Sequence, residues 1–289
     1  MTKPVLMTDS CCDLPYAYTQ QNDITVIPLT VHLGGEEIKD ELGKTGKYKE
    51  FYGAILSGQM PTTSQINTYA FKEVFQEYTS KGQEVVYIGF SSALSGCVHS
   101  ARIAAAELQE ETGENLVTVI DTKAASLGLG LLVYYANEFL KQGKTKEFIV
   151  NWIEENKLKV NHWFTVEDLN HLYRGGRLSK TAAAIGTLLS IKPIMHINDE
   201  GKLVPISKVK GRKKSLHLLL DKIKENITHA EEQVVFISHG NCEEEIIPLV
   251  QQIKEELKVK EIITNPLGAA VGAHAGPGTV AFFFLGNNR

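Results

Sequence analysis

Two short loops rich in serine and threonine are the part of this sequence best suited to chemistry. The first is residues 61–65 (PTTSQ), and the second is residues 91–96 (SSALSG), which follow the apolar run 85–90. In an open α/β sheet, ligands bind outside the carboxyl ends of the strands. Hydroxyls and backbone N–H groups at such an edge hold an anion without a fixed positive charge. We therefore expect a small acidic group, carboxylate or phosphate, held by uncharged donors.

The same hydroxyls also suit helix capping, and this alternative stays open. Thr62, Thr63 and Ser64 precede a helix expected to begin near Asn67, and Ser95 precedes one that starts at Gly96. The anion site is favoured because both loops lie at the same edge of the predicted sheet.

A serine hydrolase is the competing interpretation. Residues 89–93 (GFSSA) nearly match the nucleophile elbow G-x-S-x-G, so Ser91 or Ser92 would be the nucleophile. Asp121 and then His239 or His274 follow in the chain order of a triad. The last glycine of the elbow is alanine here, however, and this chain order is easily met by chance.

Two basic segments are candidates for phosphate recognition or for docking an acidic partner. Arg174 and Arg177 flank a Gly-Gly pair in residues 168–179, beside Ser179, which can cap a helix from Lys180. Five cations gather in residues 208–214: Lys208, Lys210, Arg212, Lys213 and Lys214. Solvated side chains on a wet surface are the alternative for both.

His274 is the only titratable residue in the stretch 268–278, which is rich in glycine and alanine. It can hydrogen-bond a carboxylate or a transferred phosphoryl group, or it can be a structural histidine. Near the N-terminus, Asp13 before Leu-Pro predicts a helix N-cap. Asp9 and Ser10, at the end of the first strand, are expected to brace neighbouring loops.

Metal and nucleotide motifs are missing from the sequence: it has no H-E-x-x-H, Walker loop or G-x-G-x-x-G. We therefore expect no cofactor. The four cysteines (11, 12, 97 and 242) form no C-x-x-C pair and predict reduced thiols in a cytoplasmic protein.

The composition is that of an ordinary soluble globule, with 289 residues, 43% hydrophobic and 22% charged. A net charge of -4 gives no electrostatic footprint for nucleic acid. The sequence has neither an apolar run of about 18 residues nor the start of a signal peptide. These features predict a cytoplasmic protein that is not embedded in a membrane, although transient membrane contact remains open.

Apolar runs alternate with helical periodicity along the chain, which predicts an α/β fold with parallel strands. Strands are expected at 5–7, 24–29, 85–90, 117–120, 162–166, 191–197, 204–209, 234–237, 261–264 and 280–285. Helices are expected at 68–78, 98–111, 126–140, 146–156, 181–189, 213–225 and 243–257.

A turn at 198–202 (NDEGK) predicts a hairpin, which breaks the strand–helix alternation and indicates a second, mixed sheet. The polar stretch 154–159 is the best boundary candidate. We predict an N-terminal parallel-sheet domain (1–158) and a C-terminal mixed-sheet α/β domain (159–289). The ligand cleft is expected between them.

Taken together, these motifs resemble the DegV family of bacterial lipid-binding proteins over essentially the whole chain. The matching pieces are residues 8–10 and 13–15, 62–65, 91–92 with 94–96, Asp121 with 126–128, 175–179, 191–193, 208–214, and His274 with 276–278. Each piece is weak alone, and their order and spacing together are specific.

The resemblance implies a two-lobed α/β protein with a long-chain fatty acid buried between the lobes. It also implies a carrier that has no catalytic activity alone and presents the fatty acid to a separate ATP-dependent kinase, which makes an acyl phosphate. Carried over by motif, Thr63 and Ser95, with Thr62 or Ser92 as less direct matches, would bind the carboxylate together with His274. Contacts to phosphate or kinase would come from Arg174, Arg177, Lys210 and Arg212.

The chain departs from the family pattern in three places. Ile66 stands where the family commonly has proline, Cys97-Val98 where it commonly has Thr-Tyr, and Lys210 where arginine is frequent. The first two leave the hydroxyls intact but can reshape the pocket. The third weakens a bidentate phosphate contact at position 210.

A regulatory binding module for a phosphorylated metabolite is a further alternative to the fatty acid carrier.

Overall fold

A computed structural model describes residues 3–179 and 190–289 of the chain. The helix expected at 181–189, and any helix that Ser179 would cap from Lys180, lie outside the described residues. Elsewhere the alternation of strands and helices read from the sequence is confirmed, and strand ends differ from expectation by a few residues at most.

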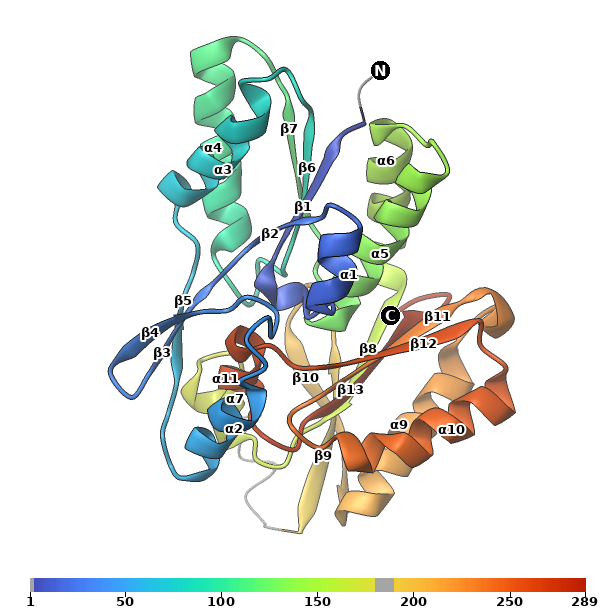
Figure 1. Ribbon diagram of the computed structural model, residues 1–289. Coiled ribbons are helices and arrows are strands. Elements are labelled where there is room, and N and C mark those ends of the chain that lie inside the picture. The colour runs from blue at the N-terminus through green and yellow to red at the C-terminus, as the bar shows by residue number, and fades with distance from the viewer. Residues whose placement is uncertain (1–2, 180–189) are drawn as a thin grey trace.

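The N-terminal part contains a four-stranded parallel sheet in the order β2-β1-β6-β7. These strands are β1 (Val5–Asp9), β2 (Thr25–Ile27), β6 (Val85–Gly89) and β7 (Val117–Asp121). Helices α3 (Thr68–Thr79) and α4 (Cys97–Thr112) cover one face, and α5 (Leu127–Lys141) and α6 (Lys146–Asn156) lie on the other (Figure 1). The strands are nearly continuous hydrophobic runs because both faces of the sheet are covered.

The C-terminal part contains a six-stranded mixed sheet in the order β10-β9-β8-β13-β11-β12. The strands are β8 (Val160–Thr165), β9 (Ile191–Ile197), β10 (Leu203–Lys210), β11 (Val234–His239), β12 (Glu261–Pro266) and β13 (Val280–Leu285). The expected hairpin joins β9 to β10, closed by hydrogen bonds between Asn198 and Lys202. Helices α9 (Arg212–Asn226) and α10 (Glu243–Leu257) lie together on one side of this sheet (Figure 1). The predicted fold class is therefore confirmed.

A third, antiparallel sheet in the order β4-β3-β5 was not expected from the sequence. It consists of β3 (Thr30–Leu33), β4 (Glu36–Lys39) and β5 (Thr62–Ser64), and helix α2 (Tyr48–Leu56) connects the last two. Thr62, Thr63 and Ser64 therefore lie on a strand and cap no helix. The cap of α3 is Asn67, whose Oδ1 accepts the Ala70 N–H at 2.9 Å.

Helix α5 joins the two parts because it packs against β1 and β6 on one side and against β8, β11 and β13 on the other. Its glycines permit close approach: a Cβ on Gly128 would lie 2.2 Å from His162 Nε2, and one on Gly130 would lie 2.6 Å from the Cys12 carbonyl. One continuous hydrophobic core runs through both parts. The domain boundary after residue 158 stays a prediction.

The remaining described elements are short: α1 (Tyr16–Gln21), α7 (Asn170–Arg174), α11 (Ala269–Ala275), and the 3₁₀ turns Ser10–Cys12, Lys157–Lys159 and Ala230–Glu232. In the described parts of the chain, no helix combines the length and the hydropathy that a bilayer span requires.

Candidate functional site

A cavity of about 300 Å³ lies where the parallel strands end and the two parts meet. Residues that follow β1, β6 and β7 line it, including Cys11, Phe90 and Ala125, and the mixed sheet contributes Phe164 and Phe283. The lining is mainly apolar, and the volume is at the lower end of ligand pockets. The rule that ligands bind at the carboxyl ends of strands thus holds for this cavity.

Thr63, Ser95, Arg177 and His274 all line this cavity. Thr63 Oγ1 lies 2.8 Å from His274 Nε2 in a hydrogen bond. Arg177 donates from Nε to the Leu94 carbonyl at 3.1 Å, next to Ser95. The structure therefore brings together four of the residues singled out in the sequence, which come from β5, the loop after β6, the loop after α7, and α11.

The charges of these four residues differ from the expectation of uncharged donors alone. Burial, aided by the positive charge of Arg177, lowers the pKa of His274 to about 4, so this histidine is neutral at pH 7. Burial also lowers the pKa of Arg177, but from 12.5, so it stays a cation. Arg177 uses two of its five N–H groups on the carbonyls of Leu94 and Gly175. The cavity thus holds one fixed positive charge beside neutral donors.

The cavity lining also contains a buried polar atom without a hydrogen-bond partner among the described residues. This atom is His274 Nδ1. It lies against the backbone of Gly175, where an added Cβ would come within 2.2 Å of it. A buried polar atom left without a partner in this way costs free energy unless a ligand or water satisfies it.

Asp9 and Ser10 brace neighbouring loops, as predicted. Asp9 accepts hydrogen bonds from the Tyr87 hydroxyl at 2.6 Å and from the Phe90 N–H at 3.1 Å. Ser10 Oγ accepts the Leu29 N–H at 3.0 Å. These bonds fix the ends of β1 and β6, from which the loops that line the cavity emerge.

The prediction that Asp13 is a helix N-cap is wrong. Asp13 has φ 52°, and its carboxylate accepts the Ser126 hydroxyl at 2.6 Å and the Gly268 N–H at 2.8 Å. Pro15 is the residue at the N-terminal boundary of α1. The left-handed backbone at Asp13 turns its side chain towards the C-terminal part instead of towards the following helix.

Thr62 and Ser92 do not line the cavity. Thr62 is exposed on β5, where alternation along the strand directs it away from the side of Thr63. Ser92 is also exposed and accepts a hydrogen bond from Lys123 Nζ at 2.8 Å.

The other basic candidates lie outside the cavity lining, Arg174 and Lys210 exposed and Arg212 half-buried. Arg174 is exposed and donates to Met60 Sδ at 3.4 Å, and Lys210 is exposed at the end of β10. Arg212 pairs with Glu245 at 2.8 Å and with Glu167 at 3.2 Å. Arg212 is therefore engaged with two carboxylates, whereas Arg174 and Lys210 are accessible.

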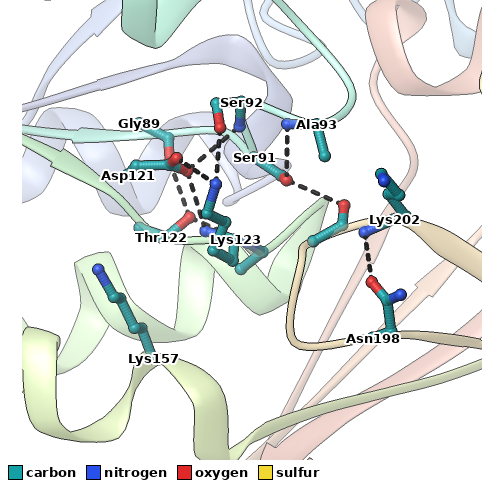
Figure 2. Close-up of polar contacts among 12 residues, drawn as sticks. Gly89, Ser91, Ser92, Ala93, Asp121, Thr122, Lys123, Lys157, Asn198 and Lys202 are labelled. Atoms are coloured by element: carbon teal, nitrogen blue, oxygen red, sulfur yellow. Dashed lines mark hydrogen bonds and ion pairs between the residues drawn. The ribbon is translucent and has the colours of Figure 1, made fainter.

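The hydrolase alternative finds no catalytic arrangement. Figure 2 shows Ser91 facing the turn that carries Asn198 and Lys202, and Lys123 directed towards Ser92 and Asp121. Ser91 Oγ donates to the Gly201 carbonyl at 2.9 Å, and Asp121 pairs with Lys123 at 2.7 Å. Within the described ranges, neither Ser91 nor Ser92 hydrogen-bonds a histidine, as a serine nucleophile requires. The Ser91 hydroxyl thus joins the loop after β6 to the turn between β9 and β10, whereas the Lys123 side chain stays within the N-terminal part, bound to Asp121 and Ser92.

Sequence reasoning missed several polar residues of the lining, namely Gln65, Ser126, His162 and Thr279. Gln65 ends the first hydroxyl loop and Ser126 begins an expected helix, and both belong to the family motifs, but neither was proposed to contact a ligand. Ser126 follows β7, so the rule about strand ends could have found it. His162 and Thr279 lie on or beside strands of the mixed sheet, where the sequence gives no signal of which face meets the cavity. Among residues 3–179 and 190–289, no three His, Cys, Asp or Glu side chains form a group that could hold a metal ion.

Comparisons with known proteins agree with this geometry. The profile of the family described as "Uncharacterised protein, DegV family" matches residues 3–287. A DegV domain-containing protein of Clostridium perfringens is 45% identical over 289 residues, covering 100% of this chain and 99% of that protein.

Two solved structures are similar over nearly the whole chain. A DegV family protein from Thermus thermophilus, described as binding fatty acid, has a TM-score of 0.88 and 32% identity, covering 99% of this chain and 100% of that one. DegV of Bacillus subtilis, described as a fatty acid binding protein, has a TM-score of 0.86 and 29% identity, with the same coverage.

Proposed function

This chain belongs to the DegV family, and from that premise we propose that it binds a long-chain fatty acid in the cavity between its two parts. The observation that carries the proposal is an apolar cavity of about 300 Å³ into which Thr63, Ser95, Arg177 and His274 converge. These residues would hold the carboxylate, and the apolar lining would enclose the chain. The fatty acids bound by similar proteins support the same ligand class.

The energetics favour an acyl ligand. A C16 chain buries on the order of 15 CH₂ and CH₃ groups at ~0.8 kcal/mol each, an upper bound near ~12 kcal/mol, from which ordering costs are subtracted. A carboxylate left unpaired in the cavity would cost several kcal/mol. The guanidinium of Arg177 and the hydroxyls of Thr63 and Ser95 offset that cost.

We propose further that the protein is a carrier without catalysis of its own, which presents the carboxylate to an ATP-dependent kinase in the cytoplasm. A carboxylate held beside Arg177 and a neutral His274 would lie next to groups suited to an incoming phosphoryl group. The exposed cations Arg174 and Lys210 are our candidates for kinase docking. Arg212 is a weaker candidate because Glu167 and Glu245 already neutralise it.

Native mass spectrometry of freshly purified protein tests the ligand. We expect an added mass of about 250–290 Da, which corresponds to a C16–C18 chain, and a marked loss of occupancy in a Thr63→Ala/Ser95→Ala double variant. A polar metabolite in place of a lipid would contradict the proposal. Full fatty acid occupancy in the double variant would contradict the assignment of the head-group site.

The role in phosphorylation needs a separate experiment. The loaded protein, a purified fatty acid kinase and ATP should form acyl phosphate, and neither protein should do so alone. His274→Ala should reduce phosphorylation more than binding. Equal phosphorylation by the variant and the parent would refute that role for His274.

A further inference from the structure

Helix α11, which carries His274, begins where two buried carboxylates from the N-terminal part meet. Asp13 accepts the Gly268 N–H at 2.8 Å, and Asp40 accepts the Ala270 N–H at 2.9 Å. A Cβ added at Gly268 would lie 2.8 Å from Asp13 Oδ1 and 2.9 Å from Asp40 Oδ2. The two carboxyl groups therefore leave no room for a side chain at Gly268, and they fix the start of the helix.

The segment before α11 is also held by the N-terminal part. Asn265 Nδ2 donates to the Asp13 carbonyl at 2.8 Å, and the Tyr52 hydroxyl donates to the Leu267 carbonyl at 3.1 Å. The approach to the helix is thus fixed by several independent bonds, and the helix itself is short. Its orientation depends on how its first turn is anchored.

Asp40 anchors α11 to the same small sheet that carries Thr63. Asp40 directly follows β4, and its N–H donates to the Leu29 carbonyl at 2.9 Å, just before β3 begins. Strand β3 pairs with β4 on one side and with β5 on the other, where Val31 is opposite Thr63. One antiparallel ladder therefore makes two bonds to α11: Asp40 to the Ala270 N–H, and Thr63 to His274. Ala270 and His274 are four residues apart, about one helical turn.

We propose that Asp40 is a positioning residue, which holds the first turn of α11 so that His274 meets Thr63 at the polar end of the cavity. The importance of this geometry for a head group depends on the proposed function, whereas the placement of His274 does not.

The chemistry of the carboxylate explains why an amide would not replace it. Burial raises the pKa of Asp40 to about 6, while hydrogen bonds from the N–H groups of Ala270, Ala269 and Leu42 and from the Ser10 hydroxyl favour its charged form. With these donors, both oxygens are required as acceptors at neutral pH. An asparagine would turn an NH₂ group towards N–H donors and leave part of the helix start unsatisfied.

Asp13 offers a matched control, because in residues 3–179 and 190–289 its carboxylate has only the Gly268 N–H and the Ser126 hydroxyl as partners. The oxygen of an asparagine can accept the Gly268 N–H, and its NH₂ group can donate to Ser126 Oγ. The Ser126 hydroxyl can then donate to Ser238 Oγ, 3.1 Å away. Asp13→Asn therefore introduces the same amide at the same junction without losing a bond.

The experiment records long-range ¹H–¹⁵N correlations of the His274 ring, assigned with a His274→Ala variant, together with the affinity for palmitate. In Asp40→Asn we expect the ring resonances to move towards those of Thr63→Val and the affinity to fall by about tenfold, the cost of one misplaced hydrogen-bonding partner. Asp13→Asn should leave the His274 ring resonances unchanged and the affinity within about twofold of the parent. A folded Asp40→Asn variant with unchanged His274 resonances would overturn the proposal.

A second variant keeps the test decisive if Asp40→Asn does not fold. Gly268→Ala leaves both carboxyl groups in place and displaces the start of α11, so the His274 resonances should again move. Gly53→Ala, where an added Cβ meets nothing within 4 Å, is its control. Unchanged resonances in Gly268→Ala would overturn the proposal. If the parent protein binds no palmitate, the proposed function fails, and the resonances still decide whether Asp40 positions His274.

Discussion

Two neighbouring threonines on β5 provide the sharpest test of the head-group site. Thr63 lines the cavity and hydrogen-bonds His274 Nε2 at 2.8 Å, whereas Thr62 is exposed on the other side of the strand. Valine has nearly the shape of threonine and also favours strands, so Thr63→Val and Thr62→Val each remove one hydroxyl from the same strand. The two variants differ only in whether the lost hydroxyl faces the cavity.

The expected magnitude follows from the hydrogen bond that, under the proposed function, the Thr63 hydroxyl makes to the fatty acid carboxylate. A hydrogen bond to a charged group contributes about 1.5–3 kcal/mol, and 1.4 kcal/mol corresponds to a tenfold change in an equilibrium constant. Thr63→Val should therefore raise the dissociation constant for palmitate by roughly 10- to 100-fold. Thr62→Val should change it by less than about twofold. Displacement of a fluorescent fatty acid, followed by isothermal titration calorimetry, measures both.

Comparable losses in the two variants would refute the reasoning, because they would show that the effect arises from the strand and not from the hydroxyl in the cavity. No loss in either variant would place the carboxylate elsewhere. Thermal unfolding of both proteins, without ligand, checks that neither substitution disturbs the small sheet.

Three further predictions follow from the same geometry. Arg177→Met should raise the pKa of His274 above its value of about 4, because a positive charge that disfavours the imidazolium is removed; an NMR titration of the ring measures this. Ala281→Phe, which places a ring in the cavity lining, should weaken palmitate binding by ~0.8 kcal/mol for every methylene displaced, with less effect on shorter acids in the same displacement assay. Asp40 has a pKa raised to about 6 in the folded protein, from about 3.8 in the unfolded chain. Its protonation therefore stabilises the folded state fully below pH 3.8, and this stabilisation is lost as the pH rises through 6. Between pH 4 and pH 7.5, denaturant unfolding should therefore show the parent losing roughly 2 kcal/mol relative to Asp40→Asn.

The central strands and long helices could be predicted because each buries a large apolar face. Strand β9 (Ile191–Ile197), strand β13 (Val280–Leu285) and helix α6 (Lys146–Asn156) match the expected bounds. Their hydrophobic periodicity is set by the same packing that stabilises them. Local sequence and tertiary structure agree at these elements.

The small sheet could not be predicted, because little of its stability is local. All four residues of β4 (Glu36–Lys39) are exposed, and β5 (Thr62–Ser64) has three polar residues. Such strands give no apolar alternation and exist because they pair with β3. The sequence therefore gives no sign of the β4-β3-β5 sheet, which places Thr63 opposite α11.

The chemical types at the site were predictable, and their orientation was not. Thr63, Ser95 and His274 were singled out as residues that could hold an acid, but Thr62 and Ser92 were equally suitable by type. Only the strand direction at β5 and the turn after β6 decide which hydroxyl faces the cavity. Arg177 was assigned to phosphate recognition. Nothing in the sequence shows that the loop after α7 places it in the cavity lining beside Ser95.

The balance of charge in the cavity links binding to the proposed transfer. Arg177 supplies one positive charge and His274, with its pKa near 4, supplies none at pH 7. A fatty acid carboxylate is therefore neutralised one to one. An acyl phosphate carries about one more negative charge, which no further cation among the described lining residues offsets. Under the proposed function, the extra positive charge must come from the kinase and its nucleotide site, so the same cavity that retains the acid would hold the phosphorylated product less tightly once the partner leaves.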